Sequence, residues 1–355
     1  MSGFEIDELV VPATLGARGS GDFRAAFDVW NTVAAESYGT PDIVYTPGEE
    51  LPQFHNPYQP KRLFVARVDG RVVAQGVTET STSEGFDLSW VALAVLPGFR
   101  GRGIGTALAD RLEEAAREDG RRRVVAYAPG HVLDGPRLPS PTGFGSVAAD
   151  DPVTRFLQRR GYSLEQVERV SRLPLPVAGL DDLLAAARER SGPDYRIHTW
   201  VDITPERWIE DRAVLATRMS TDAPSAGIEE PEDVWDAERV RVADARRPGN
   251  PRRHLVAAVE HVPSGHLVGY TMLSVPAEKH RAVQQYATLV LREHRGHRLG
   301  MLLKLANLAH LERYSPGHPS VLTFNAEENR PMLDVNEAVG FAALGYEGAW
   351  RKDLA

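Results

Sequence analysis

The sequence predicts an α/β protein made of two similar domains in tandem. Its 355 residues exceed the roughly 150 residues of a typical domain. An apolar β-type run, a basic glycine-rich turn and a helix pattern follow one another at 95–108, and again at 290–303. Helix, hairpin and strand patterns precede both turns, and a strand and a short helix follow both. A repeat of this length indicates duplicated domains rather than a solenoid.

The first half contains the elements of one such domain. Apolar periodicity predicts a helix at 22–37. Asp69-Gly70 is a strong hairpin-turn signal between β-type runs at 62–68 and 71–79. The elements expected after the hairpin are a strand at 87–95, a helix from the glycine turn to about 119, a strand at 123–127, a short helix at 154–160 and a strand at 166–175.

The second half repeats this order. Thr204 and Pro205 indicate the N-cap and first position of a helix that extends to about 219. The elements expected after it are a helix at 231–245, hairpin strands at 254–262 and 266–275, a strand at 285–291, a helix to about 314, a strand at 320–325, a helix at 330–338 and a last strand from 340. Proline and glycine bracket the segment between the halves. We therefore expect domains at 1–175 and 195–355, joined by a linker at 176–194.

Both turns have the composition of an anion-binding site. Glycine lets the backbone come close to a ligand and adopt positive φ, and the first N–H groups of the following helix point outward. The helix dipole favours negative charge at this end, and arginines add charge-assisted hydrogen bonds to phosphate. A chance Gly/Arg loop before an ordinary helix is the alternative, and a second copy with matching flanks weighs against it. The turns are therefore expected to bind a phosphate-bearing ligand.

Two common phosphate motifs do not fit these turns. A Walker loop needs Gly-Lys-Ser/Thr after four intervening residues, and a dinucleotide fingerprint needs a third glycine. Both turns instead resemble the R/Q-x-x-G-x-G/A signature of the GNAT N-acetyltransferase superfamily. The first copy fits at Arg100, Gly103 and Gly105, whereas the second has Arg298 where the middle glycine is expected.

The short helices that end at Gly161 and Gly340, each followed by an aromatic residue, are a second part of the family pattern. The second half, with H-R-G-H-R-L-G and N-R-P-M-L-x-V-N, resembles bacterial tandem GNAT proteins in particular. The resemblance covers nearly the whole chain. It implies an α/β (α+β) fold of two GNAT domains, each a mixed, mostly antiparallel sheet with helices on both sides.

The resemblance also implies acetyl-CoA as cofactor, with its pyrophosphate in the turn. Pantetheine would pair with the exposed edge of the preceding strand, and an N–H near Val95 or Val290 would face the thioester oxygen. Asparagines after the late strand would hold the cofactor arm, with helix capping by Asn325 or Asn329 as the alternative. The expected cofactor-binding residues are Val95, Arg100, Gly101, Arg102, Gly103, Ile104, Gly105, Thr106, Val290, Arg295, Gly296, His297, Arg298, Leu299, Gly300, Met301, Asn325, Asn329 and Asn336.

Acetyl transfer also needs an unprotonated amine. An alkylamine is free base in only roughly one molecule in a few thousand at pH 7, so a base is useful. The candidate bases are Glu278, His280 and His294 in the second half and Asp87 in the first. For each of them a solvated surface charge is the alternative.

The chain departs from the family where a leaving-group acid is expected. Many GNAT domains carry a tyrosine four residues before the Gly-aromatic pair, and this chain has Leu157 and Asn336 there. Leucine cannot protonate a thiolate, which weakens the first domain as a catalyst. We expect the second domain to be the catalyst, because it has the asparagines and the polar strand Gln284-Gln285-Tyr286. Its candidate catalytic residues are Tyr286, Asn336 and Glu278.

Composition excludes several other classes of function. A net charge of −8 argues against a nucleic-acid-binding surface. The chain has no cysteine and no histidine spacing typical of a metal site, so no metal is expected. The N-terminus lacks an apolar signal core, and no apolar run reaches membrane-spanning length. We therefore expect a cytoplasmic protein without a membrane partner.

The predicted function is acetyl-CoA-dependent N-acetylation of a small-molecule amine by a monomer or homodimer. Transfer of a different acyl group is an alternative that the turn cannot distinguish. A non-catalytic acyl-CoA-binding or sensing protein is a second alternative, which the missing tyrosines keep open.

Overall fold

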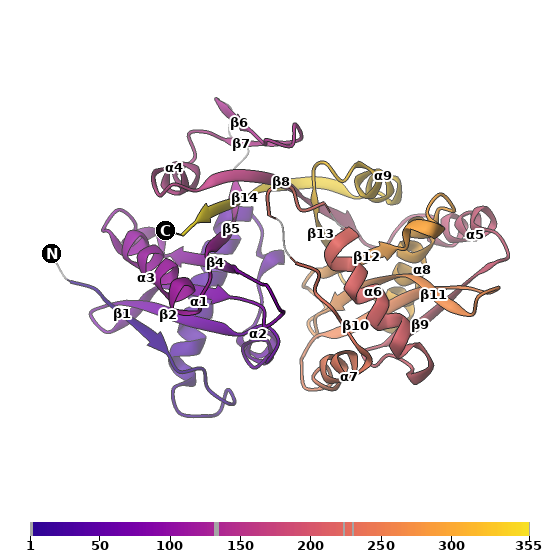
Figure 1. The fold of residues 1–355 in the computed structure, drawn as a ribbon, viewed down its shortest axis with the longest axis horizontal. Helices are drawn as coiled ribbons and strands as arrows, with labels where there is room; N and C mark the ends of the chain where they lie inside the picture. The colour runs from indigo at the N-terminus through magenta and orange to yellow at the C-terminus, as the bar shows by residue number, and fades with distance from the viewer. Residues whose placement is uncertain (1–2, 131–134, 223, 229–230, 355) are drawn as a thin grey trace. The chain divides into compact units, whose positions relative to one another are not determined.

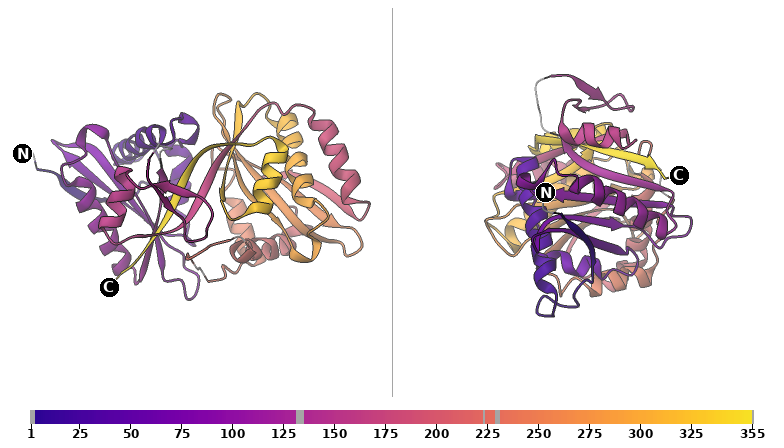
Figure 2. Two further views of the ribbon diagram at one scale, coloured as in Figure 1. Left: turned by 90° about the horizontal axis from the view of Figure 1, so that it is seen from above. Right: turned by 90° about the vertical axis from the view of Figure 1, so that its left-hand side faces the viewer.

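The computed structural model describes residues 3–130, 135–222, 224–228 and 231–354. They form two compact units, whose elements are labelled in Figure 1 and seen from two further sides in Figure 2. Unit 1 comprises Met1–Glu168, Ser225–Pro231 and Gly345–Ala355, and unit 2 comprises Arg169–Pro224 and Glu232–Leu344. Each unit has a mixed sheet with helices on both faces, so the α/β fold that the sequence predicts is confirmed.

The strands of unit 1 include β1 (Glu5–Leu9), β2 (Lys61–Val68), β3 (Arg71–Glu79), β4 (Leu88–Val95), β5 (Arg123–Gly130) and the unit 1 part of β14 (Ala342–Asp353). They lie in the order β1-β2-β3-β4-β5-β14. Only β4 and β5 are parallel among these neighbours, because a helix crosses over between them. The last strand of the chain thus extends the sheet of unit 1 beside β5.

The helices of unit 1 are α1 (Ser20–Tyr38), α2 (Pro47–Phe54), α3 (Ile104–Glu118) and α4 (Pro152–Arg159). Helices α1 and α2 pack on one face of the sheet, and α3 and α4 on the other. The alternation of side chains along β2 separates the two cores. Leu63 and Val65 lie in the core under α1, whereas Phe64 and Ala66 lie in the core under α3.

Shorter elements complete unit 1: the 3-10 helix η1 (Pro41–Ile43), the strand pair β6 (Arg137–Pro139) and β7 (Ser146–Ala148), and the first part of β8 (Ser163–Pro174). The segment Ser225–Pro231 is held through Ile228. Its side chain is 3% exposed and packs with Leu88, Val125 and Ala349.

The strands of unit 2 include β9 (Tyr195–Val201), β10 (Arg253–His261), β11 (His266–Val275), β12 (Val283–Val290) and β13 (Ser320–Ala326). They lie in the order β13-β12-β11-β10-β9, and only β12 and β13 are parallel. The helices are α5 (Leu180–Ser191), α6 (Ile209–Asp222), α7 (Ala237–Ala245), α8 (Leu299–Tyr314) and α9 (Arg330–Val339). Helices α5 and α8 share one core with β10 and β11, and α6 packs on the opposite face. The parallel pair of each unit thus has its crossover helix, α3 or α8, on the face opposite α1 or α6.

The predicted hairpins are confirmed, and one predicted helix cap is wrong. Asp69 and Gly70 both have positive φ, as their hairpin turn requires. Thr204 is not the N-cap, because that position is one residue later, at Pro205, and no side chain caps it. The Thr204 N–H donates to Asp244 Oδ2 at 2.8 Å. Pro205 instead precedes a 3-10 turn, η3 (Glu206–Trp208), which continues directly into α6.

Helix α7 begins at Ala237 rather than near 231, because the Asp236 side chain accepts a hydrogen bond from Arg239 N and caps the helix there. The segment expected as a linker, 176–194, contains α5, which contributes Leu184 to the core of unit 2. The division into domains at 1–175 and 195–355 stays a prediction about folding units.

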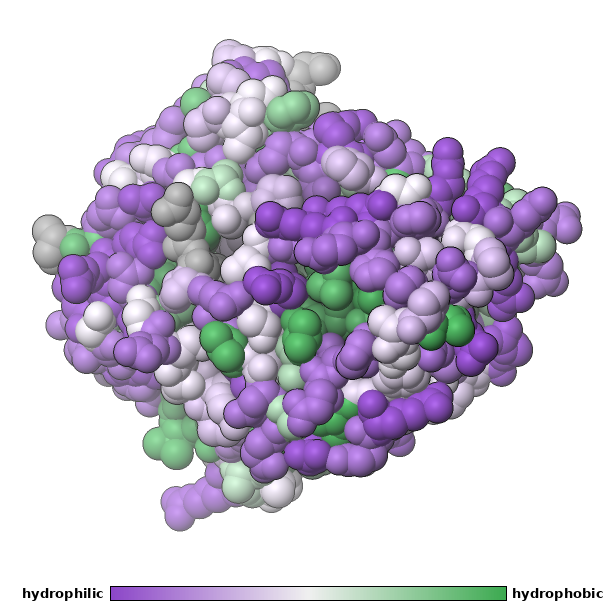
Figure 3. All heavy atoms as spheres, turned by 45° about the vertical axis from the view of Figure 1, so that its right-hand side comes forward, coloured by the Kyte–Doolittle hydropathy of each residue, from purple (hydrophilic) through white to green (hydrophobic). Residues whose placement is uncertain are grey.

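The surface gives no sign of a membrane-spanning segment. None of the helices in the described part of the chain combines the length and apolar character that a bilayer crossing needs. On the face drawn in Figure 3, hydrophilic side chains predominate and apolar ones appear singly or in small groups. Within the described ranges, no cluster of three or more histidine, aspartate or glutamate side chains is placed to hold a metal ion.

Candidate functional site

The turn after β4 in unit 1 is shaped by glycines. Gly101 and Gly103 have φ of 73° and 85°, a region that residues with a Cβ rarely adopt. The 3-10 turn η2 (Pro97–Phe99) precedes them, and Gly103 is the N-cap of α3. Beside Gly105 a Cβ would meet only Val95 Cγ2, at 3.6 Å. A ligand can therefore approach the backbone of this turn closely.

The turn after β12 in unit 2 follows the same backbone path. The 3-10 turn η4 (Arg292–His294) is followed by Gly296, with φ of 89°, and by Arg298, the N-cap of α8, with φ of 55°. Arg298 thus takes the left-handed conformation that Gly103 takes in unit 1, at a cost of about 1–2 kcal/mol. Nothing lies within 4 Å of a Cβ placed on Gly300. The second turn departs from the signature in a side chain and not in its backbone.

Both crossover helices begin without a side-chain cap. The first backbone hydrogen bond within α3 runs from Ala107 N to Gly103 O, and that within α8 from Leu302 N to Arg298 O. In each helix, the three backbone N–H groups before this first bond have no partner inside the helix. They belong to Ile104, Gly105 and Thr106 in unit 1 and to Leu299, Gly300 and Met301 in unit 2. Together with the helix dipole, each set forms a site for phosphate.

The first arginine of each signature, Arg100 or Arg295, braces its turn. Each Nε donates to the carbonyl oxygen of the residue five positions earlier, at 3.0 Å and 3.1 Å. Each Nη2 also pairs with a carboxylate near the C-terminal end of a helix, Glu36 of α1 or Asp222 of α6. The sequence predicts phosphate contacts for these arginines. In the structure their guanidinium groups also fix the turn to the strand and helix before it.

In each unit the strand before the turn separates from its parallel neighbour. Strand β4 pairs with β5 only over Leu88–Trp90, and β12 pairs with β13 only at Val283 and Gln284. On its other side β4 stays paired with β3 as far as Val95. A gap therefore opens between the parallel strands toward the turn, and its edges offer unpaired backbone groups to an extended ligand.

One of these backbone groups is the N–H of Val95. Leu96 N donates to β3, so the alternation along a strand directs the N–H of Val95 to the opposite edge, into the gap. Leu291 N donates to β11 in the same way, which directs the N–H of Val290 into the gap of unit 2. That one of these N–H groups donates to the thioester oxygen stays a prediction.

A pocket of ≈740 Å³ passes through the gap in unit 1. At one end it is lined by the turn residues Arg100, Gly101, Gly103, Gly105 and Thr106. On the face of the sheet that α1 covers, it is lined by Trp30, Val33, Tyr38, Trp90 and Glu347, among others. Most of the remaining wall is apolar and comes from β4, β5 and α4. The pocket therefore connects the phosphate-binding turn with the opposite face of the sheet.

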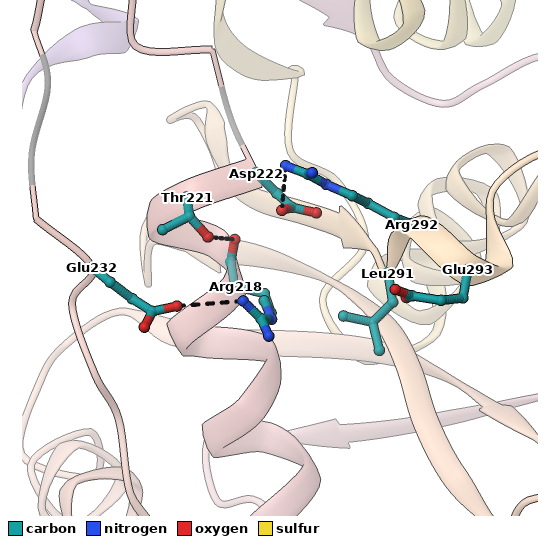
Figure 4. Close-up of a pocket in the computed structure, with 7 residues that line it drawn as sticks. All are labelled: Arg218, Thr221, Asp222, Glu232, Leu291, Arg292 and Glu293. Carbon is teal, nitrogen blue, oxygen red and sulfur yellow. Dashed lines mark hydrogen bonds and ion pairs between the residues drawn. The ribbon is translucent and has the colours of Figure 1, made fainter.

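A smaller pocket of ≈390 Å³ lies beside the turn of unit 2 (Figure 4). Most of the side chains around it are charged, and several of them form ion pairs. Asp222, whose side chain is 6% exposed, binds Arg292 at 3.1 Å and Arg295 at 2.7 Å. Arg218 pairs with Glu232 at 3.4 Å across the pocket. A single carboxylate thus pairs with two arginines next to the second turn.

The structure brings together two of the three asparagines in the predicted site of unit 2. Asn336 Nδ2 donates to Asn325 Oδ1 at 2.7 Å. Asn325 lies on β13 beyond the residues that pair with β12. Asn336 lies on α9 with 1% exposure. The Asn336 Oδ1 has no hydrogen-bond partner among the described residues. Asn329 is the N-cap of α9, but its side chain makes no capping hydrogen bond.

Among the described residues, neither of the other two candidate catalytic residues forms a hydrogen bond with this asparagine pair. Tyr286 lies on β12 with 49% exposure, its ring 6.0 Å from that of His254. Glu278 forms an ion pair with Arg281 at 2.9 Å in the loop between β11 and β12. Burial acts to raise the pKa of Glu278, but the hydrogen bond from Arg281, a backbone hydrogen bond and the charges of Arg281 and His280 together outweigh it, and the pKa is lowered. A lowered pKa makes this carboxylate a weaker base.

Sequence reasoning missed two polar residues of the unit 1 pocket, Tyr38 and Glu347. The Tyr38 hydroxyl donates to a Glu347 carboxylate oxygen, although the two residues are 309 positions apart. Tyr38 is the last residue of α1 and Glu347 lies on β14. No local pattern connects them, because the contact depends on the pairing of the last strand with β5.

Comparison with known proteins gives consistent matches. Residues 29–133 match the model of the acetyltransferase (GNAT) family. A mycothiol acetyltransferase of Thermobispora bispora is 27% identical over 264 residues, which cover 73% of this chain and 75% of that protein. A tandem GNAT protein from the clavulanic acid biosynthesis pathway, solved without AcCoA, has a TM-score of 0.73 and 27% identity, over 99% of this chain and 98% of that one.

A GCN5-related N-acetyltransferase from Sphaerobacter thermophilus shares the fold, with a TM-score of 0.64 and 16% identity over 99% of this chain and 95% of that one. The family match includes the first turn, and the likeness to the tandem GNAT protein extends over both turns. Around these turns, both units have the same strand, the same helix without a side-chain cap and the same open gap. The chain is therefore a tandem-domain member of the GNAT superfamily, of the bacterial type, and an acyltransferase that works with acyl-CoA.

Proposed function

We propose that unit 1 transfers the acetyl group of acetyl-CoA to the nitrogen of a small-molecule amine. The observation that carries the proposal is the pocket through the gap between β4 and β5. It connects the turn, which suits a pyrophosphate, with a chamber on the face under α1. The cofactor and the acceptor can therefore enter from opposite faces of the sheet and meet in the gap.

The residues of unit 1 have distinct roles in this proposal. The N–H groups of Ile104, Gly105 and Thr106 bind the pyrophosphate. The free edges of β4 and β5 hold the pantetheine arm, and the Val95 N–H polarises the thioester carbonyl. Leu157 lines the pocket and cannot supply a proton. The departing sulfur therefore takes its proton from the attacking amine or from water.

The acceptor is proposed to be a small molecule on two grounds. The chamber under α1 is part of a pocket of ≈740 Å³, which suits a small ligand. In addition, two relatives that cover most of this chain are named mycothiol acetyltransferase, which supports an acceptor of that size. Acetyl is the acyl group that these names support.

The second unit retains a role in the proposal. Its turn suits a pyrophosphate, and the sequence favours unit 2 as the catalyst because of Asn325 and Asn336. That assignment stays a prediction, and the pocket favours unit 1. A chain that binds acyl-CoA without transferring it is the competing function, favoured by Leu157 at the position of the expected acid.

Titration calorimetry with acetyl-CoA on matched variants tests the proposal. Gly105→Glu and Gly300→Glu place a carboxylate at equivalent points of the two turns, where neither position needs positive φ. We expect Gly105→Glu to abolish one of the binding events. It should also abolish the release of coenzyme A from acetyl-CoA that amines bring about. Loss of activity only with Gly300→Glu would assign catalysis to unit 2. Binding without any turnover would favour the competing function.

A further inference from the structure

The pocket of unit 1 contains a buried acidic group on the face away from the crossover helix. Along β14, Trp350 packs in the core under α3, whereas Ala349 packs with Leu88 and Val125 on the other face. Because side chains alternate along a strand, Glu347 shares the face of Ala349. Its carboxyl group thus lies on the side of α1, at the end of the pocket opposite the phosphate-binding turn.

The surroundings of Glu347 contain hydrogen-bond partners but no cation. Tyr38 donates its hydroxyl to the carboxylate, and Glu168 is a further hydrogen-bonding neighbour. Within the described residues, no lysine, arginine or histidine forms an ion pair with Glu347. The two arginines that line the pocket are engaged elsewhere: Arg100 with Glu36, and Arg160 with Glu113 and Asp110.

Burial without a counter-ion has a cost for this carboxyl group. Glu347 is 7% exposed, and burial raises its pKa, against the opposing effect of the hydrogen bonds from Tyr38 and Glu168. Burial, and then the charge of Glu347, raise the pKa of Tyr38, so its phenol stays protonated and remains a donor. A carboxylate in such a place is strongly stabilised by a cation that enters the pocket.

The rest of the chamber determines what kind of cation fits. Trp30 and Val33 of α1 and Trp90 of β4 line it together with Glu347. These side chains offer apolar and aromatic surface, which packs against the body of a ligand and attracts a positive charge over the indole faces. A small hydrated ion gains nothing from such walls, whereas an ammonium on an apolar body does.

We infer that Glu347, held by Tyr38, binds the ammonium group of the acceptor and makes the unit 1 pocket selective for cationic amines with an apolar body. This rests on the proposed function, whose acceptor it specifies. Glu347 comes from the last strand of the chain and not from the segment that carries the turn. The acceptor site of unit 1 is therefore completed by residues 345–355.

A pair of probes of equal shape tests the inference on the full-length chain. 2-Phenylethylamine and 2-phenylethanol are titrated calorimetrically, with and without saturating coenzyme A. We expect wild type to bind the amine roughly 30-fold more tightly than the alcohol, and Glu347→Gln to reduce this preference to about twofold. Glutamine keeps the size of the side chain and still accepts the Tyr38 hydroxyl.

Asp353→Asn is the matched control. It removes a carboxylate from the exposed end of the same strand, where its partner is Arg351, and should keep the full preference for the amine. Equal binding of amine and alcohol by wild type, no binding of the amine, or a preference that survives Glu347→Gln would each overturn the inference. The comparison of the amine with the alcohol on the wild-type chain does not depend on the folding of any variant. A failure of coenzyme A to bind would instead count against the proposed function.

Discussion

Asp222→Asn should raise the affinity of the second turn for phosphate. The carboxylate lies at the end of α6 and pairs with Arg292, as Figure 4 shows. It also pairs with Arg295. A bound pyrophosphate would be repelled by this carboxylate and would compete with it for the two guanidinium groups. Asparagine removes the charge and keeps the shape of the side chain. Arg295 stays in place through its bond to the carbonyl of Val290.

The size of the effect follows from Coulomb's law. Two unit charges about 8 Å apart interact with about 0.5 kcal/mol in water, so a doubly charged pyrophosphate is relieved of about 1 kcal/mol. Each arginine that is freed adds up to about 1 kcal/mol, reduced by its exposure to solvent. The sum of about 1–2 kcal/mol corresponds to a roughly 5- to 30-fold lower dissociation constant.

The assay is calorimetric titration of coenzyme A into chains that carry Gly105→Glu, so that only the second turn can bind. The gain should shrink as salt is added, because exposed charges are screened. Glu36→Gln, tested in the Gly300→Glu background, is the control for the first turn. Glu36 is half-exposed and holds one arginine, so a change of less than about threefold is expected. Unchanged or weaker binding in Asp222→Asn would refute the reasoning.

Three further substitutions test the packing around the two sites by urea unfolding. Arg298→Gly removes the left-handed strain of a non-glycine N-cap, whose φ is 55°, and should stabilise unit 2 by about 1 kcal/mol; no gain would contradict the strain. Lys304 is buried and burial lowers its pKa to about 7, so between pH 7 and 10 the unfolded chain binds more protons and stability should rise with pH. Lys304→Met should abolish that rise and stabilise unit 2 at pH 7 by up to roughly 4 kcal/mol, whereas an unchanged pH profile would contradict the burial argument. Gly76→Ala places a Cβ 3.0 Å from Leu112 and should cost about 1 kcal/mol, while Gly21→Ala in open space on α1 should not destabilise; equal effects would contradict the packing argument.

The parts of the site that were predictable from the sequence are those made by local backbone. Gly103 needs positive φ at a helix start, and the free N–H groups follow from the helix itself. A short run of residues therefore specifies the phosphate end of each site. The same local reasoning located both hairpins and the strands of both parallel pairs. It failed at Thr204, because the 3-10 turn that leads into α6 begins at Glu206 and Pro205 takes the N-cap position.

The parts that were not predictable depend on contacts between distant segments. Tyr38 and Glu347 carry no motif, and their meeting requires β14 to pair with β5 across more than half of the chain. Asp222 gave no signal either, because its role appears only when the end of α6 lies beside η4. Polar side chains that act through tertiary contacts have neither a period nor a spacing that one sequence can reveal.

The two units share the phosphate end of the site and differ at the thioester end, and their construction explains why. The phosphate end is made by backbone groups, so it survives the exchange of Gly103 for Arg298 with the same path of the chain. The proposed thioester end also includes side chains beside the backbone N–H groups of Val95 and Val290, and these side chains are free to diverge. Four residues before the terminal glycine of the short helix, unit 1 has Leu157 and unit 2 has Asn336.

The strand registers give a second difference of the same kind. Leu88 pairs with Arg123 and the equivalent Val283 pairs with Val321, so Tyr127 on β5 corresponds to Asn325 on β13. In unit 1 an apolar gap opens onto a chamber whose carboxyl group, that of Glu347, forms no ion pair within the described residues. In unit 2 the gap has two joined amides, one with an unpartnered buried oxygen that can accept a hydrogen bond from a pantetheine N–H. The side chains thus suit unit 1 for an acceptor beside the thioester and unit 2 for holding the cofactor arm.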